Sequence, residues 1–309
     1  MSDRVLLIWD ENRHPFILGG CLFLLVEGFL KKTELNAKHV DLAIIGRFTE
    51  GELKGKAFDI LGSPQSATTP LFKALLSIQG CNSIILSQTK RDLEKHIKES
   101  NDLAIIWPSL NALEPSEYLI GTGLVCSHYH QLGHAIPDIR LNTDLQKQAE
   151  ILIAKLCNDK PIISLHLKNN PNVIGESNAD MPVWAEFLAS CQDQATFIIT
   201  GNEAVSKEIE QLENVYITQN QGSSLALDLA LISKSNGFMG TSSALCQMAI
   251  FSQMPYVIFK NPDHHVEEMS RDLGDGDHFP FARPNQKLLR EYETKAGLKN
   301  ALQFILSNP

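Results

Sequence analysis

Short apolar runs alternate along the chain with stretches in which apolar residues recur every three or four positions. The runs predicted to be strands are residues 4–9, 42–46, 83–87, 103–107, 124–129, 162–167, 196–200, 214–218, 237–240 and 256–259. Helical periodicity is found at residues 15–30, 90–98, 143–157, 182–191, 203–212, 242–251 and 285–306. Most of the strand runs are continuously apolar, which is typical of strands covered by helices on both faces. This alternation predicts an α/β fold with parallel sheets and right-handed crossovers.

The length of 309 residues favours two sheets of five strands over a single sheet of ten. We therefore expect two Rossmann-like domains that face each other across a cleft. The predicted boundaries are an N-terminal domain at 1–145, a second domain at 146–284, and a C-terminal helical segment at 285–309 that packs back on the first domain.

Charge and cysteine usage narrow the class of protein. The formal net charge of -9 and the isoelectric point near 5.6 argue against a nucleic-acid binder, which would show a basic face. The six cysteines form no C-x-x-C pair, as expected for reduced thiols of a cytoplasmic protein. The run "FILGGCLFLLVEGFL" contains Glu27 and is shorter than the ~20 residues that span a bilayer, so a buried helix is expected. At most, peripheral contact with a membrane is predicted.

Polar residues that directly follow the strands are the candidates for a binding site, because ligands of open parallel sheets bind at the carboxyl ends of the strands. In the first half these candidates are Asp10, Glu11, Asn12 and His14, and the His128/His130 pair, which would share one face of a strand. In the second half they include Lys168, Asn202 and the group from Gly240 to Ser243. The stretch "FMGTSSALCQMAIF" leaves two interpretations open. Its serines and threonine cap the following helix, or the same hydroxyls and the exposed amides of the first helical turn hold a phosphate.

Three segments carry a resemblance to a known group of enzymes. They are "IISLHLKNNPNVIGESNADMPVWAEFLA", with His166, Lys168, Ser177-Asn178 and Trp184; "TFIITGN"; and "LALDLALISKSNGFMGTSSALCQMAIFSQMPYVIF". In this order and spacing they resemble the nucleotide-sugar domain of bacterial glycosyltransferases of the GT-B type, as in heptosyltransferase-like and O-fucosyltransferase-like enzymes. The resemblance covers about residues 161–259. Lys168 stands where the fucosyltransferase-like enzymes have an arginine.

The resemblance implies transfer of a sugar from a nucleotide-diphosphate sugar to a hydroxyl of a glycan or glycolipid, as in cell-envelope glycan synthesis. It implies an inverting reaction, no cofactor beyond the donor, and no metal. The diphosphate would be held by His166, Lys168, Ser242 and Ser243, with Gly240 and Thr241 beside them, and Asn178 and Asn202 would orient the donor. Asp10 is the expected general base, with Glu11 and His14 as rivals.

Other interpretations remain beside this one. The chain can be a non-catalytic nucleotide- or nucleotide-sugar-binding protein of the same fold, or a sugar-nucleotide epimerase or hydrolase. The segment "NPDHH" at 261–265 lacks the further aspartates of a metal-dependent phosphoesterase, and "CSHYHQLGH" matches no closed zinc site. In the second domain, His264 or His265 is expected to line the nucleotide pocket or to be exposed.

Overall fold

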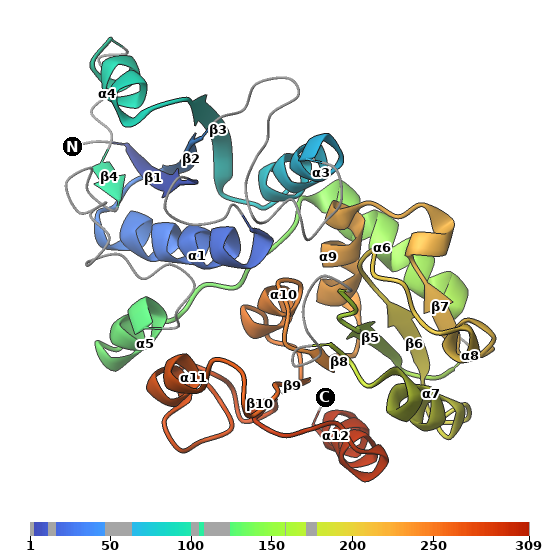
Figure 1. Cartoon of the computed structure of the whole chain (residues 1–309). Coiled ribbons are helices and arrows are strands. Elements are labelled where there is room, and N and C mark those ends of the chain that lie inside the picture. The colour runs from blue at the N-terminus through green and yellow to red at the C-terminus, as the bar shows by residue number, and fades with distance from the viewer. Residues whose placement is uncertain are drawn as a thin grey trace. The chain divides into compact units, whose positions relative to one another are not determined.

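Two parallel β-sheets organise the chain, one in each half of the sequence (Figure 1). The computed structural model describes residues 3–11, 17–46, 64–99, 105–107, 124–157, 159–170 and 178–308. The chain divides into two compact units, Met1–Arg140 and Leu141–Pro309, each with its own sheet and helices. The predicted α/β fold with two Rossmann-like units is confirmed.

The first unit contains a four-stranded sheet of order β3-β2-β1-β4, in which all the pairings are parallel. Its strands are β1 (Arg4–Asp10), β2 (His39–Ile45), β3 (Cys81–Ser87) and β4 (Ile105–Trp107). Its helices are α1 (Leu18–Glu34), α3 (Pro64–Leu76), α4 (Lys90–Glu99) and α5 (Leu124–Gln131).

Both faces of β1 are buried, which explains why its sequence is continuously apolar from Val5 to Trp9. Leu6 and Ile8 pack towards Leu93 of α4 on one face. Leu7 lies on the opposite face, against α1, where Gly28 approaches it so closely that a Cβ would lie 2.6 Å from Leu7 Cδ1. Gly28 thus lets α1 pack closely on the sheet, and a larger residue there would force Leu7 to move.

The second unit contains a six-stranded parallel sheet of order β10-β9-β8-β5-β6-β7. Its strands are β5 (Ile162–His166), β6 (Thr196–Ile199), β7 (Val215–Ile217), β8 (Gly237–Thr241), β9 (Tyr256–Phe259) and β10 (Gln286–Leu289). Its helices are α6 (Thr143–Leu156), α7 (Met181–Ala189), α8 (Lys207–Glu210), α9 (Leu225–Lys234), α10 (Cys246–Ile250), α11 (Val266–Leu273) and α12 (Lys295–Ser307). In chain order the strands run 3-2-1-4-5-6, the doubly wound order, and the order reverses between β5 and β8.

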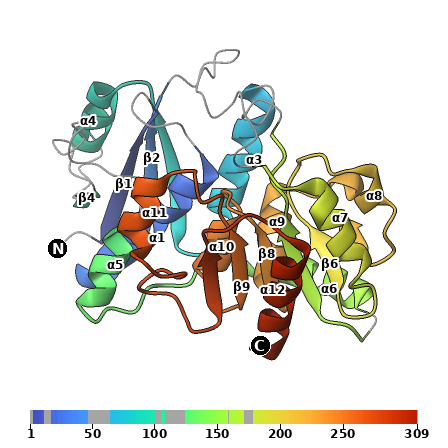
Figure 2. The ribbon, with the colours of Figure 1, turned by 60° about the horizontal axis from the view of Figure 1, so that its bottom comes forward.

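Helices cover both faces of this second sheet. On one face α7 and α12 contribute Trp184, Phe187, Leu298 and Ile305 to a core shared with the strands. On the other face α9 and α10 contact β5, β8 and β9, and α6 packs on α9. The apolar side of α12 is thus buried within the second unit, beside β8 and β9 (Figure 2).

Two predicted elements are wrong in type. Residues 124–129 form the helix α5 rather than a strand, because Cys126 and Tyr129, three positions apart, are buried together while His128 is exposed. Residues 286–289 form the strand β10 rather than the start of the last helix, because Gln286 and Leu288 alternate into the core and pair in register with β9. The described sheets therefore have four and six strands instead of five and five.

Candidate functional site

The carboxyl edge of the second sheet brings together the ends of β5, β8 and β9. His166, the last residue of β5, lies in register with Gly240 of β8, and Thr241 of β8 lies in register with Phe259 of β9. Residues that follow these strands therefore meet at one edge, next to the point where the strand order reverses. This is where open α/β sheets bind their ligands.

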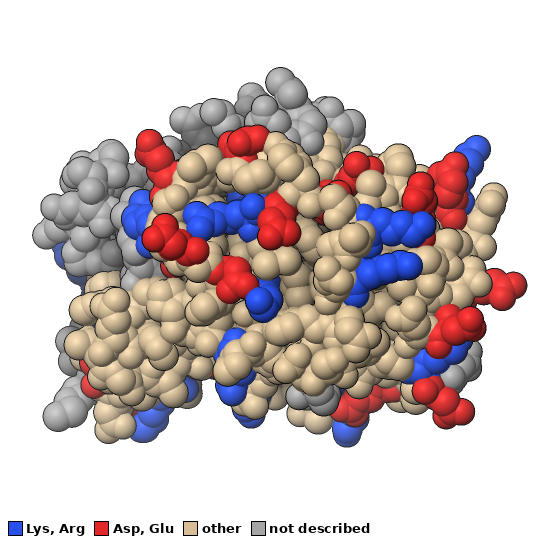
Figure 3. All heavy atoms as spheres, turned by 90° about the horizontal axis from the view of Figure 1, so that it is seen from below, with Lys and Arg blue, Asp and Glu red and all other residues tan. Residues whose placement is uncertain are grey.

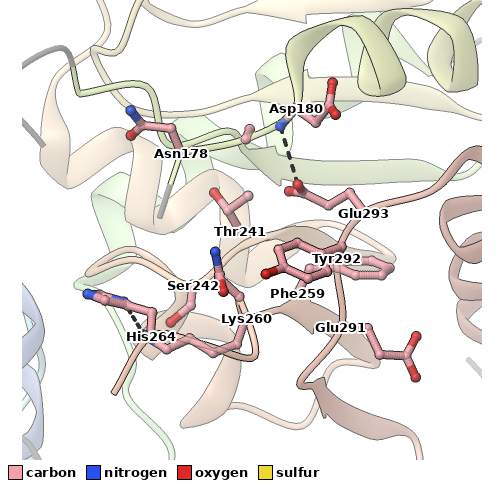
Figure 4. A pocket seen from close by; sticks show the side chains of 12 residues that line it. Asn178, Asp180, Thr241, Ser242, Phe259, Lys260, His264, Glu291, Tyr292 and Glu293 are labelled. Atoms are coloured by element: carbon pink, nitrogen blue, oxygen red, sulfur yellow. Dashed lines mark hydrogen bonds between the residues drawn. The ribbon is translucent and has the colours of Figure 1, made fainter. Parts of the chain in front are cut away.

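A pocket of about 280 Å³ opens at this edge (Figure 4). Its lining comes from the ends of β8, β9 and β10 and from the segment before α7. The lining residues are Asn178, Ala179, Asp180, Thr241, Ser242, Phe259, Lys260, Asn261, His264, Glu291, Tyr292 and Glu293. Backbone, hydroxyl, carboxylate and amine groups thus converge on one concavity, as they do in small-molecule sites.

Lys260 is the buried cation of this pocket. It directly follows β9, is only 7% exposed, and its Nζ lies 3.0 Å from Nδ1 of His264. Burial, and then the charge of Lys168, lower the pKa of Lys260 to about 8. Burial, and then the charge of Lys260, lower the pKa of His264 to about 4. The imidazole is therefore neutral near pH 7, and the Lys260 ammonium donates a hydrogen bond to its Nδ1.

Lys168 places a second cation near the first. It follows β5, and its backbone N–H donates a 2.8 Å hydrogen bond to Oγ1 of Thr241. Burial lowers the pKa of Lys168, against the opposing influence of the Glu203 carboxylate. Since Lys168 also depresses the pKa of Lys260, the two ammonium groups repel each other across a partly desolvated region. An anion that binds between or beside them relieves this repulsion.

Carboxylates lie on the other side of the pocket. Oδ1 of Asp180 accepts from Val183 N and caps α7, and Glu293 accepts from Asp180 N at 3.2 Å and from Nε1 of Trp184 at 3.1 Å. The hydroxyl of Tyr292 donates to Asp263, which ties the segment after β10 to the segment after β9. In Figure 4 the Lys260 side chain extends towards His264, away from Glu291.

His166 takes part in a buried network behind the pocket rather than in its lining. Its Nδ1 lies 2.9 Å from the Thr200 carbonyl and its Nε2 lies 3.5 Å from Oε1 of Glu203. Burial opposes protonation of His166, but the Glu203 carboxylate outweighs it and the pKa of His166 is raised. Burial would raise the pKa of Glu203, but His166 lowers it overall. The His166–Glu203 pair therefore fixes the Gly201 turn, whose amide also donates to Asp228.

The predicted site residues separate into three groups. Asn178, Thr241 and Ser242 line the pocket, and Lys168 lies beside them. Asn178 uses its amide group to hold both the N–H and the carbonyl of Asn170, so it positions the segment before α7. His166, Asn202, Gly240 and Ser243 lie outside the lining. Asn12, His14 and Ser177 lie outside the described residues.

The capping interpretation of the stretch after β8 is wrong, and the phosphate interpretation stays a prediction. Helix α10 begins at Cys246, four residues after Ser242, its N-cap is Leu245, and no side chain caps it. Oγ of Ser243 contacts Sγ of Cys246 at 3.3 Å instead. Gly240 is needed because a Cβ would collide with the His166 carbonyl on the neighbouring strand, so its closeness serves strand packing. Thr241 and Ser242 reach the pocket directly from the strand end.

Two parts of the pocket were missed by the sequence. Lys260 directly follows "YVIF", so its position after a predicted strand could have identified it. The residues predicted to contribute after that strand begin only at Asn261. Glu291, Tyr292 and Glu293 follow β10, which was predicted to be helix, so no signal placed them at a strand end.

The first unit carries a pair of acidic residues at the end of β1. Asp10 is buried, and Glu11 is the next residue. Burial, and then the charge of Asp10, raise the pKa of Glu11. Oε1 of Glu11 is buried and accepts no hydrogen bond from the described residues. The raised pKa makes the ionised Glu11 carboxylate a stronger base.

Within the described parts of the chain, no three His, Cys, Asp or Glu side chains come together as metal ligands. His128 and His130, which would share one face of a strand, lie on helix α5, where positions two apart point in different directions. The described helices also include none with the length and apolar character needed to cross a bilayer. On the face drawn in Figure 3, basic side chains occur in small groups with acidic ones nearby.

Comparison with known proteins gives similarity at the level of structure alone. No family model matches the sequence, and no curated protein matches it. The chain resembles the glycosyl transferase family 9 protein of Veillonella parvula, with a TM-score of 0.61 and 12% identity over 99% of this chain and 98% of that one. It resembles the E. coli ADP-heptose lps heptosyltransferase II with a TM-score of 0.60 and 12% identity over 99% of both chains.

A third similar structure is the E. coli heptosyltransferase WaaC with ADP, with a TM-score of 0.52 and 11% identity over 99% of this chain and 97% of that one. At these identities the likeness defines the fold. The predicted GT-B architecture is therefore confirmed: the chain has the fold of GT-B glycosyltransferases, with two Rossmann-like units.

Proposed function

We propose that the chain is a glycosyltransferase that moves a sugar from a nucleotide-diphosphate sugar to a hydroxyl of a glycan or glycolipid. The observation that carries this proposal is the buried Lys260 ammonium, with Lys168 close by, at the carboxyl edge where the strand order of the second sheet reverses. Two mutually repelling, partly desolvated cations form a site for a strongly anionic group such as a diphosphate. The shared fold with heptosyltransferase structures supports a nucleotide sugar as the source of that diphosphate.

The leaving group of the reaction would be held in the pocket of the second unit. When the bond between the anomeric carbon and the phosphate oxygen breaks, negative charge accumulates on the nucleoside diphosphate. Lys260 and Lys168 would neutralise this charge, and the hydroxyls of Thr241 and Ser242 would donate hydrogen bonds to it. These groups supply the charge stabilisation that a divalent cation supplies in other transferases, so we propose that the transfer needs no metal.

His166 and Asn178 act on the donor through other groups in this proposal. The His166–Glu203 pair fixes the turn after β6, and Asn178 holds the segment that leads into α7. Asn202 is exposed on that same turn, and Gly240 keeps β5 and β8 close. They are positioning residues rather than phosphate ligands.

The general base would come from the end of β1 in the first unit. Asp10 is the base proposed from the sequence, and Glu11, with its raised pKa and an Oε1 that accepts no hydrogen bond from the described residues, is the rival. The base takes the proton of the acceptor hydroxyl while that oxygen attacks the anomeric carbon. The nucleoside diphosphate then departs from the opposite face, which makes the transfer inverting.

The proposal is tested by thermal unfolding of the protein with ADP, GDP, UDP, CMP and their sugars, in EDTA and again with magnesium. One nucleotide should raise the midpoint in EDTA, since a ligand that binds only the folded state stabilises it. Donor turnover with and without acceptor then separates the activities. Consumption of the donor without acceptor would indicate a hydrolase or epimerase, and binding without consumption would indicate a binding protein. Absence of any stabilisation would overturn the proposal.

A further inference from the structure

Three basic side chains pack against one another at one side of the pocket. Nζ of the buried Lys260 lies 3.0 Å from Nδ1 of His264, which lines the pocket together with Ser242 (Figure 4). The ring of His265 lies against the ring of His264, with 3.9 Å between the two centroids and 33° between the two planes. Basic groups this close repel one another when charged, so without an anion they do not all hold a proton.

The backbone of His265 keeps its ring in this position. Its φ is 58°, in the left-handed region that residues with a side chain rarely adopt. His265 is the N-cap residue of α11, but its side chain accepts no hydrogen bond from the first turn of that helix. The strained backbone therefore makes the His265 ring a neighbour of His264 rather than a cap.

The hydrogen bond between Lys260 and His264 exists only while His264 is neutral. An ammonium group can only donate, so Nδ1 of His264 is the acceptor and the ring proton of His264 is on Nε2. A protonated imidazole has no lone pair at Nδ1 and could not accept from Lys260. Protonation of His264 and its hydrogen bond with Lys260 therefore exclude each other.

Titratable groups from four segments of the second unit surround His264. They are Lys168 after β5, Lys260 and Asp263 after β9, His265 and Glu268 at and in α11, and Tyr292 after β10.

Most of the charges among these groups oppose a proton on His264. Burial is the largest influence, and the positive charges add to it, so that the pKa of His264 is about 4 although Glu268 acts in the opposite direction. Asp263 already accepts from the Tyr292 hydroxyl. A phosphate brings negative charge to the same place, so the pKa of His264 should return to its ordinary value of about 6.5 or rise above it.

We propose that His264 is a further phosphate-binding group of the pocket, which takes up a proton from solvent when the phosphate binds. This inference rests on the proposed function, since it assumes a phosphate beside Lys260. The arriving phosphate accepts the hydrogen bond of Lys260, which leaves Nδ1 of His264 without its donor. One proton passes from solvent to Nδ1, no other covalent bond changes, and the imidazolium donates to the anion.

The consequence is a site that binds phosphate more tightly in acid. Between pH 7.5 and pH 5.5 the affinity for pyrophosphate should increase roughly tenfold more in the parent than in a variant without this imidazole, because binding and protonation are linked. The affinity is thereby regulated by pH in the range where His264 changes its charge.

The test compares the parent with His264→Asn by calorimetry of pyrophosphate in EDTA at pH 6, in two buffers with different heats of ionisation. The amide oxygen of asparagine can accept from Lys260 in place of Nδ1, but it takes no proton. The parent should take up at least about half a proton more per bound pyrophosphate than His264→Asn. The proton exchange of pyrophosphate itself is common to both proteins and cancels in this difference, which should vanish at pH 8.5.

His278→Asn is the matched control. It removes an exposed histidine of the same unit that does not line the pocket, and its proton uptake should equal that of the parent. Proton NMR gives a second measurement, with the His264 resonance assigned by its loss in His264→Asn. At pH 6 this resonance should be that of a neutral imidazole without pyrophosphate, and it should move most of the way to the imidazolium position at saturation.

Equal proton uptake in the parent and His264→Asn would overturn the inference, as would a His264 resonance that stays neutral when pyrophosphate is bound. Binding of pyrophosphate in either case would leave the proposed function standing. If pyrophosphate binds to none of the three proteins, the proposed function and this inference fall together.

Discussion

Nζ of Lys260 lies 3.0 Å from Nδ1 of His264, and the pKa values of both groups are lowered, to about 8 and about 4. In each case burial is the first cause, followed by a neighbouring positive charge, Lys168 for Lys260 and Lys260 for His264. Near pH 7 the lysine is therefore protonated and the histidine is neutral. A buried cation whose hydrogen-bond partner is neutral keeps its full charge for an incoming anion.

The affinity for pyrophosphate or a nucleoside diphosphate should fall as the pH rises through about 8. Below that value Lys260 is charged, and above it the empty pocket loses the charge that the anion needs. The expected decline approaches about tenfold per pH unit. Calorimetry from pH 6.5 to 9.5 measures it.

Lys260→Arg provides the comparison for this pH profile, since a guanidinium stays protonated throughout the range. In that variant the decline should begin only where Lys168 loses its proton. Identical profiles for the parent and the variant would show that Lys260 does not govern the binding.

Replacing Glu203 by Gln should destabilise the second unit most between about pH 4.5 and 6.5. The raised pKa of His166 contributes stability below its unfolded value of about 6.5, and this contribution is lost as the pH rises through the folded value. The lowered pKa of Glu203 contributes stability above its unfolded value, and this contribution is lost as the pH falls. Both contributions are present together only in that window.

The expected loss is about 1–3 kcal/mol in the free energy of unfolding, measured with denaturant at pH 5.5 and again at pH 8.5. Glu210→Gln, an exposed change on α8, is the control and should change little at either pH. A Glu203→Gln loss as large at pH 8.5 as at pH 5.5 would contradict the ion pair.

Gly240→Ala should lower stability by about 1–3 kcal/mol or more, because the added methyl group meets the His166 carbonyl of the neighbouring strand. The φ of Gly240 is +159°, which residues with a side chain rarely adopt, so backbone strain adds to the crowding between β5 and β8. Thermal unfolding without ligand measures it. Full stability of the variant with weakened nucleotide binding would instead support the phosphate role expected for Gly240 from the sequence.

Much of the second unit could be predicted from sequence because most of its strands are apolar over nearly their whole length, a pattern typical of strands covered on both faces. Thr241 and Ser242 were found at the pocket because they follow such a strand directly. The α5 segment was misassigned because a short apolar run does not separate a strand from one face of a helix. The strand β10 was hidden by the helical periodicity of α12, which begins a few residues later.

The roles of the individual site residues were harder to predict than the position of the site in the fold. The roles of His166 and Gly240 depend on neighbours on other strands, Glu203 and the His166 carbonyl, that no local pattern reveals. The place of Ser243 depends on α10 starting later than its capping sequence suggests. Glu291 could not be found without β10, since its position follows from that strand.

The identity of the general base is tested by Asp10→Asn and Glu11→Gln. The variant that removes the base should reduce the rate of transfer by about 10²–10⁴-fold. Its affinity for the nucleotide should remain that of the parent, since the proposed diphosphate groups are all in the second unit. Retained transfer in both variants would exclude this pair of carboxylates as the base.

The most direct test of the account is calorimetry of the best-stabilising nucleoside diphosphate in EDTA with the parent, Lys260→Met and Lys299→Met. Both variants lose one positive charge of the second unit, but Lys299 is exposed on α12 and does not line the pocket. We predict that Lys260→Met weakens binding by at least about tenfold, as expected for loss of a charge-assisted contact, while Lys299→Met binds like the parent. Equal affinities in all three proteins would show that the diphosphate does not bind at Lys260.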